Sequence, residues 1–90
     1  MDKLKKKIKQ EKIISGILDF LKLGNPSIKK KKIPLNKSLM ELGYLDSFGI
    51  IELVTYLEKK YDIKIEDNEI TLEIFGSIEK MADLVIKKTN

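Results

Sequence analysis

One serine of this 90-residue chain lies where a hydroxyl group could be modified by another enzyme. Ser47 stands in the segment 43–49, with the sequence GYLDSFG, immediately before a helical pattern of apolar residues. Aspartate is a strong N-cap, so Asp46 predicts that a helix begins directly after it and leaves Ser47 exposed at the junction. Serine is also favoured at helix starts for reasons of stability, so Ser47 taken alone indicates no chemistry.

The rest of the chain offers this serine no ordinary catalytic partner. The sequence contains no cysteine and no histidine. Without a thiolate or an imidazole, no zinc site is expected, and a Ser–His or Cys–His pair is impossible within one chain. An autonomous hydrolase using Ser47 would need a lysine as its base. We therefore expect no catalytic residue, no metal site and no enzyme activity.

Composition predicts a single small globular protein. Hydrophobic residues make up 42% and charged residues 36% of the chain, which is typical of one folded domain, here residues 1–90. No segment approaches the ~20 apolar residues of a membrane span, and the basic N-terminal region lacks the unbroken apolar stretch of a signal peptide. The missing cysteines suit a reducing compartment, so we expect a cytoplasmic protein without stable membrane insertion.

The charge is divided unequally along the chain. Residues 1–32 hold 11 lysines and 3 acidic residues, a net charge of +8, whereas residues 33–90 hold 7 lysines and 11 acidic residues, a net charge of −4. A partner that docks around Ser47 is therefore expected to be basic. The run Lys29–Lys32 is either a contact for anionic lipid or nucleic acid or simply a solvated loop.

The apolar periodicity predicts an all-α protein, a bundle of three longer helices and one short helix. The helices are expected at about residues 3–22, 47–60, 67–74 and 77–88, with Ser77 as a cap and residues 24–26 (GNP) as a stop. A long first loop, residues 23–46, joins the first two helices, and a turn of helix is expected within it at 38–42. Residues 61–65 alternate like a strand, but an extended connection is the better interpretation because no partner strand is present.

Each helix has an apolar stripe that predicts its buried face. The expected core residues of the four segments are, in chain order, Leu4, Ile8, Ile14, Ile17, Leu18 and Leu21; Ile28, Ile33, Leu35, Leu39, Met40 and Leu42; Ile50, Ile51, Leu53, Val54, Leu57 and Tyr61; and Ile65, Phe75, Ile78, Met81, Leu84 and Val85.

With its surroundings, the Asp46-Ser47 pair resembles the acyl carrier protein family. The resemblance rests on the ordered segments 39–43 (LMELG), 45–48 (LDSF), 52–54 (ELV) and 57–58 (LE), together with matching residues downstream. It covers residues 38–86 well and the first helix only in its pattern. A lone Asp-Ser pair would be uninformative, but the same pair with these flanking elements in order is a specific signal.

The resemblance implies that Ser47 carries a 4'-phosphopantetheine arm, with Asp46 as the adjacent motif residue. A separate magnesium-dependent phosphopantetheinyl transferase takes the arm from coenzyme A and must supply the base that activates the serine. The thiol of the arm then holds an acyl group as a thioester for loading and processing enzymes. The family is mostly monomeric. The residues expected to dock these partners are Leu45, Phe48, Ile51, Glu52 and Glu58.

Two departures leave the cargo and the partners open. Phe48-Gly49 resembles D-alanyl carriers and other stand-alone carriers, so an aminoacyl or peptidyl carrier is an alternative to an acyl carrier. Lys59 and Lys60 dilute the acidic face that the family usually presents. A further alternative, from another class, is a basic amphipathic module that uses its first helix on a membrane or a nucleic acid. No aromatic residues interleave with Lys29–Lys32, which argues against a platform for single-stranded nucleic acid.

Overall fold

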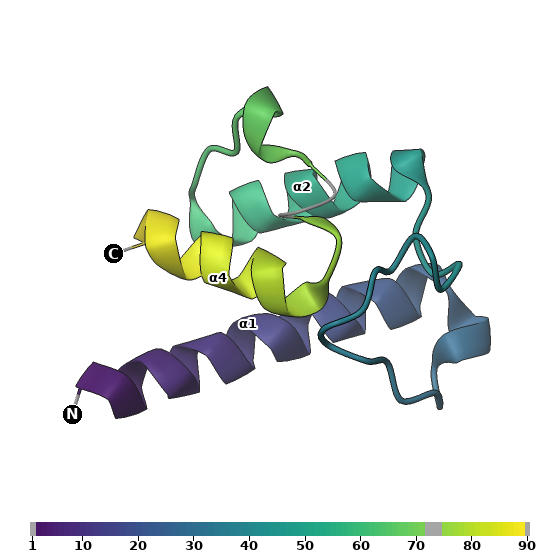
Figure 1. The fold of residues 1–90 in the computed structure, drawn as a ribbon, viewed down its shortest axis with the longest axis horizontal. Coiled ribbons are helices and arrows are strands. Elements are labelled where there is room, and N and C mark those ends of the chain that lie inside the picture. The colour runs from purple at the N-terminus through teal and green to yellow at the C-terminus, as the bar shows by residue number, and fades with distance from the viewer. Residues whose placement is uncertain (1, 72–74, 90) are drawn as a thin grey trace.

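The computed structural model describes residues 2–71 and 75–89, and the described chain is helical with no β-strand. Its α-helices are α1 (Asp2–Gly24), α2 (Ser47–Tyr61) and α4 (Ile78–Thr89), and two 3-10 turns, η1 (Pro26–Ile28) and η2 (Asp67–Glu69), lie between them. Figure 1 shows α2 and α4 running antiparallel to α1, and α4 packs against both other helices. The expected all-α class is therefore confirmed.

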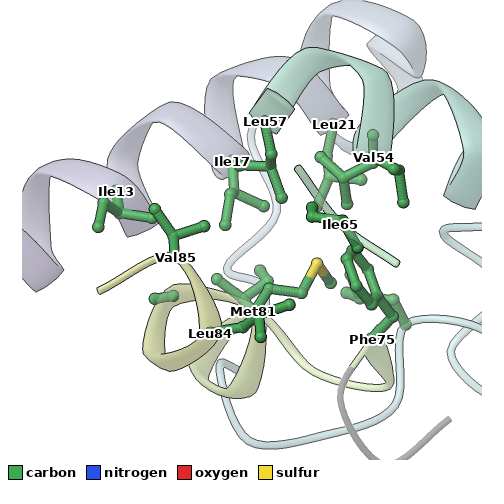
Figure 2. Packing of buried hydrophobic residues seen from close by; sticks show 14 of the residues in the cluster. Ile13, Ile17, Leu21, Val54, Leu57, Ile65, Phe75, Met81, Leu84 and Val85 are labelled. Atoms are coloured by element: carbon green, nitrogen blue, oxygen red, sulfur yellow. The ribbon is translucent and has the colours of Figure 1, made fainter. Parts of the chain in front are cut away.

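Helix α4 is the centre of the hydrophobic core. Half of its 12 residues are buried: Ile78, Met81, Ala82, Leu84, Val85 and Ile86. Figure 2 shows Met81, Leu84 and Val85 of α4 facing Ile13, Ile17 and Leu21 of α1 and Val54 and Leu57 of α2, with Ile65 and Phe75 in the same cluster. The core is therefore built between α4 and the buried faces of the other two helices.

Local signals set the helix ends much as the sequence indicates. Helix α1 ends at Gly24, and Pro26 opens η1, because proline lacks the N–H that a continuing helix needs. The buried Ser77 accepts a hydrogen bond from the Lys80 N–H at 3.3 Å, so it caps α4 as expected. Asp62, at the end of α2, has a left-handed backbone with a φ of 52°, and residues 63–66 lie in no helix or strand. Of the short helix expected at 67–74, the described part contains the 3-10 turn Asp67–Glu69, and residues 72–74 lie outside the described residues.

The predicted buried stripe was wrong at the start of α1. Leu4 is 62% exposed and Ile8 is 47% exposed, whereas Ile13, which the prediction missed, is completely buried. In the described chain, residues 3–8 of α1 are all exposed, and burial begins at Lys9 and Gln10, where the Gln10 side chain donates a hydrogen bond to Asp83 of α4 at 3.4 Å. An apolar residue at the start of the helix therefore has little to pack against.

The same reasoning corrects three other positions. Leu35 and Leu42 are each 37% exposed and Ile51 is 61% exposed, although the pattern placed all three in the core. Two of them lie in turns of the long loop, and Ile51 lies on the outer side of α2, so an apolar residue type alone did not determine burial.

Backbone hydrogen bonds attach the long loop, residues 25–46, to the start of α4. The Leu39 N–H donates to the Gly76 carbonyl at 2.8 Å, and the Glu79 N–H donates to the Leu35 carbonyl at 3.0 Å. Three side chains of the loop itself are buried in the core: Ile28, Ile33 and Leu39. A loop pinned by its own backbone and by three buried side chains is part of the fold, so it delivers the chain to Ser47 at a defined place.

Candidate functional site

The site is built around the first turn of α2, where Ser47 is the first helical residue and is exposed. Asp46 has extended backbone, and its Oδ1 accepts a hydrogen bond from the Gly49 N–H at 2.7 Å. Its own carbonyl accepts the first helical bond, from the Ile50 N–H at 3.0 Å. The expected N-cap is confirmed, and it holds Ser47 at the helix start with its hydroxyl accessible to solvent.

The turn before the site ends in a Schellman motif, which explains the Leu-Gly pair that precedes Asp46. The Tyr44 N–H donates to the Leu39 carbonyl at 2.9 Å, and the Gly43 N–H donates to the Met40 carbonyl at 3.1 Å. Gly43 has a φ of +78°, a conformation that glycine adopts without the steric cost of a Cβ. Because Leu39 is completely buried, this motif ties the segment leading to Ser47 directly to the core.

Gly49 lets the segment 45–46 lie close against α2. A Cβ at this position would lie 3.3 Å from Leu45 Cγ and Cδ1 and from Asp46 Oδ1. Those distances are shorter than usual for a Cβ, so any larger residue would push against both the capping carboxylate and Leu45. The glycine that departs from the usual family pattern therefore has a packing role.

A groove of about 920 Å³ lies directly beside Ser47. Three segments form it: the end of α1, the loop before α2, and the first turns of α2. The lining residues are Phe20, Leu21, Leu23, Gly24, Asn25, Met40, Gly43, Tyr44, Leu45, Asp46, Ser47, Phe48, Gly49 and Glu52. The residues expected from the sequence lie on the α2 side of this groove, and those on the α1 side were not expected. The predicted helix stop at Gly24 was the one signal in the sequence that the chain turns back there.

An aromatic stack attaches the α1 side of the groove to α2. The rings of Phe20 and Tyr56 lie 4.8 Å apart at an angle of 26°, and Phe20 also lines the groove. Burial raises the pKa of the Tyr56 hydroxyl above its ordinary value, and the nearby Tyr61 and Asp19 raise it further. The hydroxyl therefore stays neutral in the interface between the two helices.

The residues expected to dock partners divide into two groups. Phe48 is 69% exposed, Ile51 is 61% exposed and Glu52 is exposed, so these three form an apolar and acidic surface beside Ser47. Leu45 is half-buried in the groove. Glu58 is different, because its carboxylate accepts a hydrogen bond from the Ile65 N–H at 3.0 Å and thereby holds the segment after α2.

This arrangement presents an exposed hydroxyl at the start of α2, with Asp46 and Glu52 in the same groove. The sequence contains no histidine, and the described residues hold no cluster of acidic side chains arranged to bind a metal ion. No helix of the described chain is both long enough and apolar enough to cross a membrane. The fold and the site define a small helical domain with an exposed serine at a helix start, beside an open groove.

Comparison with known proteins identifies the family of this domain. A family model described as a phosphopantetheine attachment site matches residues 11–85. An acyl carrier protein of Buchnera aphidicola subsp. Schizaphis graminum is 35% identical over 88 residues, which cover 98% of this chain and 96% of that protein. An acyl carrier protein of Cyanophora paradoxa is 34% identical over 81 residues, 89% of this chain and 77% of that protein. The chain belongs to the phosphopantetheine-binding carrier proteins.

A third relative comes from another branch of the family. A D-alanyl carrier protein of Streptococcus thermophilus is 29% identical over 56 residues, which cover 62% of this chain and 71% of that protein. The cofactor shared by the family is a covalently attached 4'-phosphopantetheine, and its members carry a substrate as a thioester and do not themselves catalyse its conversion. An exposed serine hydroxyl next to an open groove fits such a group.

Proposed function

We propose that Ser47 is the attachment site, and that this protein presents an acyl group on its phosphopantetheine arm to partner enzymes without being an enzyme itself. The observation that carries the proposal is the position of the hydroxyl, exposed on the first residue of a 15-residue helix. A phosphodiester formed there would lie at the positive end of the α2 dipole, where an anion is favoured.

The loading step needs only one atom from this chain. The Ser47 oxygen forms a bond to the phosphorus that carries pantetheine in coenzyme A, and the bond from that phosphorus to the nucleotide part breaks. The serine proton passes to a base of the transferase, because this chain has no histidine to accept it. Once attached, the arm supplies a thiol that holds the cargo as a thioester.

An acyl cargo is favoured over an aminoacyl one by the extent of similarity. The two acyl carrier proteins match 98% and 89% of this chain, whereas the D-alanyl carrier matches 62% at lower identity. Phe48-Gly49 is the feature that favours the D-alanyl alternative. A D-alanyl carrier would be charged with D-alanine by its cognate ligase, and an acyl carrier would be charged with a fatty acyl group by an acyl-carrier synthetase.

The exposed surface beside Ser47 supports docking by the transferase and by acyl-processing enzymes. Phe48 and Ile51 offer apolar area, and Glu52 offers a negative charge for a basic partner. Leu45 and Glu58 extend this surface in the proposal, although Glu58 also has its hydrogen bond to Ile65. The proposal also includes that residues 1–90 form one monomeric domain and that this domain is a four-helix bundle.

The first prediction tests the attachment residue by intact mass. We expect the purified chain, incubated with coenzyme A, magnesium and a broad-specificity phosphopantetheinyl transferase, to gain the mass of one phosphopantetheine. Ser47→Ala is expected to gain none, because the only hydroxyl at the start of α2 is gone, and its free energy of unfolding should stay within about 0.5 kcal/mol because residue 47 is exposed.

Ser27→Ala is the matched control. Ser27 is another exposed serine, in η1 immediately after a helix, so its removal tests whether any accessible serine is loaded. It should load like the wild-type chain. Loading of Ser47→Ala, or no loading of a correctly folded wild-type chain beside a loaded positive control, would contradict the proposal.

A further inference from the structure

The first two turns of α1 form a part of the helix that nothing in the described chain covers. Every residue from Lys3 to Ile8 is exposed, including the large apolar side chains of Leu4 and Ile8. This end of α1 lies at the periphery of the molecule (Figure 1), before the hydrogen bond from Gln10 to Asp83 of α4. The exposed segment is therefore available to a partner other than the protein itself.

Leu4 and Ile8 point away from the core of the protein. An α-helix turns by about 100° per residue, so Leu4 and Ile8 lie within about 40° of each other on one side. Ile13 and Ile17, which are completely buried, lie about 180° from that pair. The two exposed apolar residues thus belong to a second face of α1, opposite the face that packs on α4.

Lysines border this second face on both sides. By the same geometry, Lys3 and Lys7 flank Leu4 and Ile8 on one side, and Lys5 and Lys12 flank them on the other; all four lysines are exposed. The exposed Glu11 lies on the same side of the helix as Leu4 and Ile8, at the end of this face nearest the rest of α1, so the net charge of the face is positive but not uniformly so. A lysine can extend its ammonium group outward while its methylene chain lies along an apolar surface. We name this feature, residues 3–12, the basic helix end.

The basic helix end is electrostatically unfavourable in water. Lys3 and Lys7, and likewise Lys5 and Lys9, are like charges four residues apart, and all of them lie near the positive N-terminal end of the helix dipole. The ion pair found in the described part of the chain joins Lys88 to Glu69, far from this segment in the sequence. A negatively charged surface would relieve both kinds of repulsion.

We propose that the basic helix end binds reversibly to the surface of an anionic lipid membrane. Leu4 and Ile8 would enter the boundary between head groups and acyl chains, and the flanking lysines would contact anionic head groups. Nucleic acid would use the lysines but leave the two apolar residues without a partner, and protein interfaces are depleted in lysine. The combination of both residue types favours lipid.

Binding in this way leaves the serine site free. The groove beside Ser47 includes Gly24 and Asn25, at the other end of α1. Gly24 lies 18 residues after position 6, which is about 27 Å along the helix. The membrane and an enzyme docked at Ser47 would therefore occupy opposite ends of α1. The inference goes beyond the carrier function and does not depend on it.

Sedimentation with phospholipid vesicles tests the proposal on the full-length chain. We expect binding to large unilamellar vesicles with about 30% phosphatidylglycerol in phosphatidylcholine, weakened by salt, and none to pure phosphatidylcholine. Leu4→Gln/Ile8→Gln, which leaves the charge unchanged, should lower the partition constant about tenfold because two apolar side chains no longer enter the lipid. Leu23→Gln, at an 83% exposed position at the far end of α1, should leave it unchanged.

Two variants of equal charge separate a defined site from general attraction. Replacing Lys3, Lys5, Lys7 and Lys12 by glutamine, or instead Lys29 to Lys32 by glutamine, lowers the net charge from +4 to 0 in both cases. We expect the first change to abolish vesicle binding and the second to weaken it by less than about threefold. Ser47→Ala should bind vesicles like the wild-type chain, whether or not Ser47 carries an arm.

Three results would overturn the proposal: no binding of the wild-type chain to the anionic vesicles at about 100 mM salt, equal loss in both quadruple variants, or unchanged binding of Leu4→Gln/Ile8→Gln. A DNA duplex that binds the chain as tightly as the vesicles do, insensitive to the loss of Leu4 and Ile8, would assign the segment to nucleic acid instead. Circular dichroism spectra identical to wild type show that each variant is folded; Leu4 and Ile8 lie outside the core, so we expect this result.

Discussion

At the residue scale, Asp46 and Ser47 have different tasks although they are neighbours in one motif. The Asp46 carboxylate accepts the Gly49 N–H and so begins α2, whereas Ser47 is left exposed. The same aspartate therefore determines both where the helix starts and which residue stands first in it. The motif is a structural cap joined to an exposed serine, and substitutions can separate the two.

The second prediction separates the cap from its charge. Asp46→Ala should lower the free energy of unfolding by about 1 kcal/mol, measured by urea denaturation, because the Gly49 N–H loses its acceptor. Asp46→Asn keeps an acceptor at the same place and should retain most of the stability. If Asp46→Ala were as stable as the wild-type chain, the capping role would be contradicted. If Asp46→Asn is stable but is loaded slowly, the transferase requires the negative charge.

At the element scale, the contact between α1 and α2 depends on a glycine. A Cβ at Gly16 would lie 2.6 Å from the Tyr56 hydroxyl oxygen, whereas a Cβ at Gly24 would have no atom within 4 Å. Gly16 thus allows Tyr56 to reach across α1 and stack on Phe20, which lines the groove beside Ser47. Helix packing at this one position helps to hold the wall of the site.

The third prediction compares these two glycines. Gly16→Ala should be less stable than Gly24→Ala by at least about 1 kcal/mol in urea denaturation, because the added methyl group displaces Tyr56. Tyr56→Phe removes the hydroxyl that the methyl group would meet, so the double variant Gly16→Ala/Tyr56→Phe should recover most of the loss relative to Tyr56→Phe alone. Equal stability of Gly16→Ala and Gly24→Ala would contradict this account.

An ion pair connects η2 to the last turn of α4. Glu69 Oε1 lies 2.7 Å from the Lys88 ammonium nitrogen and also accepts the Glu66 N–H at 2.8 Å. The hydrogen bond from Lys88, and then that from the Glu66 backbone, hold the pKa of Glu69 below its ordinary value of 4.5. The carboxylate therefore helps to attach the segment after α2 to the end of the chain.

The fourth prediction follows from the sign of that shift. A carboxyl group whose pKa is lowered by folding stabilises the protein above its pKa in the unfolded chain, and this contribution disappears as the pH falls through the folded value. The stabilisation should therefore be present above about pH 4.5 and be lost below it. Thermal unfolding of Glu69→Gln between pH 6 and pH 3 should show a smaller loss of Tm than the wild-type chain.

Asp67→Asn is the control for this experiment. It removes a carboxylate from the same turn, but leaves the contact between Glu69 and Lys88 intact. Its Tm should fall with acid as the wild-type Tm does. An equal acid dependence in Glu69→Gln and the wild-type chain would show that this ion pair contributes nothing measurable, as happens for many exposed pairs.

At the scale of the whole molecule, opposite ends of α1 have different surroundings. Its start is a basic, uncovered helix end, and its last turn forms one wall of the groove beside Ser47. The exposed lysines at the start of α1 contribute to the charge of +8 in residues 1–32, and the exposed Glu52 near Ser47 contributes to the charge of −4 in residues 33–90. The proposed attachment site lies at one end, and the proposed membrane contact lies at the other.

The sequence by itself determined the features that depend on neighbouring residues. The cap at Asp46, the stop at Gly24 and the cap at Ser77 follow from contacts within a few positions along the chain, and the apolar periodicity that predicted the inner face of α4 is likewise a local pattern. Local propensity and periodicity act over that distance, so these predictions were confirmed. The order of motif residues around Ser47 also indicated the family, because that order is a property of the amino-acid sequence alone.

Only the tertiary structure decided which apolar residues have a partner. Leu4, Ile8 and Ile51 have the same character as buried residues on their helices, yet they are exposed, because in the described chain neither the start of α1 nor the outer side of α2 is covered. The groove likewise joins residues from α1 and α2 that are more than twenty positions apart. Burial and grooves depend on how elements meet in space, and periodicity within one element contains no information about the length or position of its neighbour.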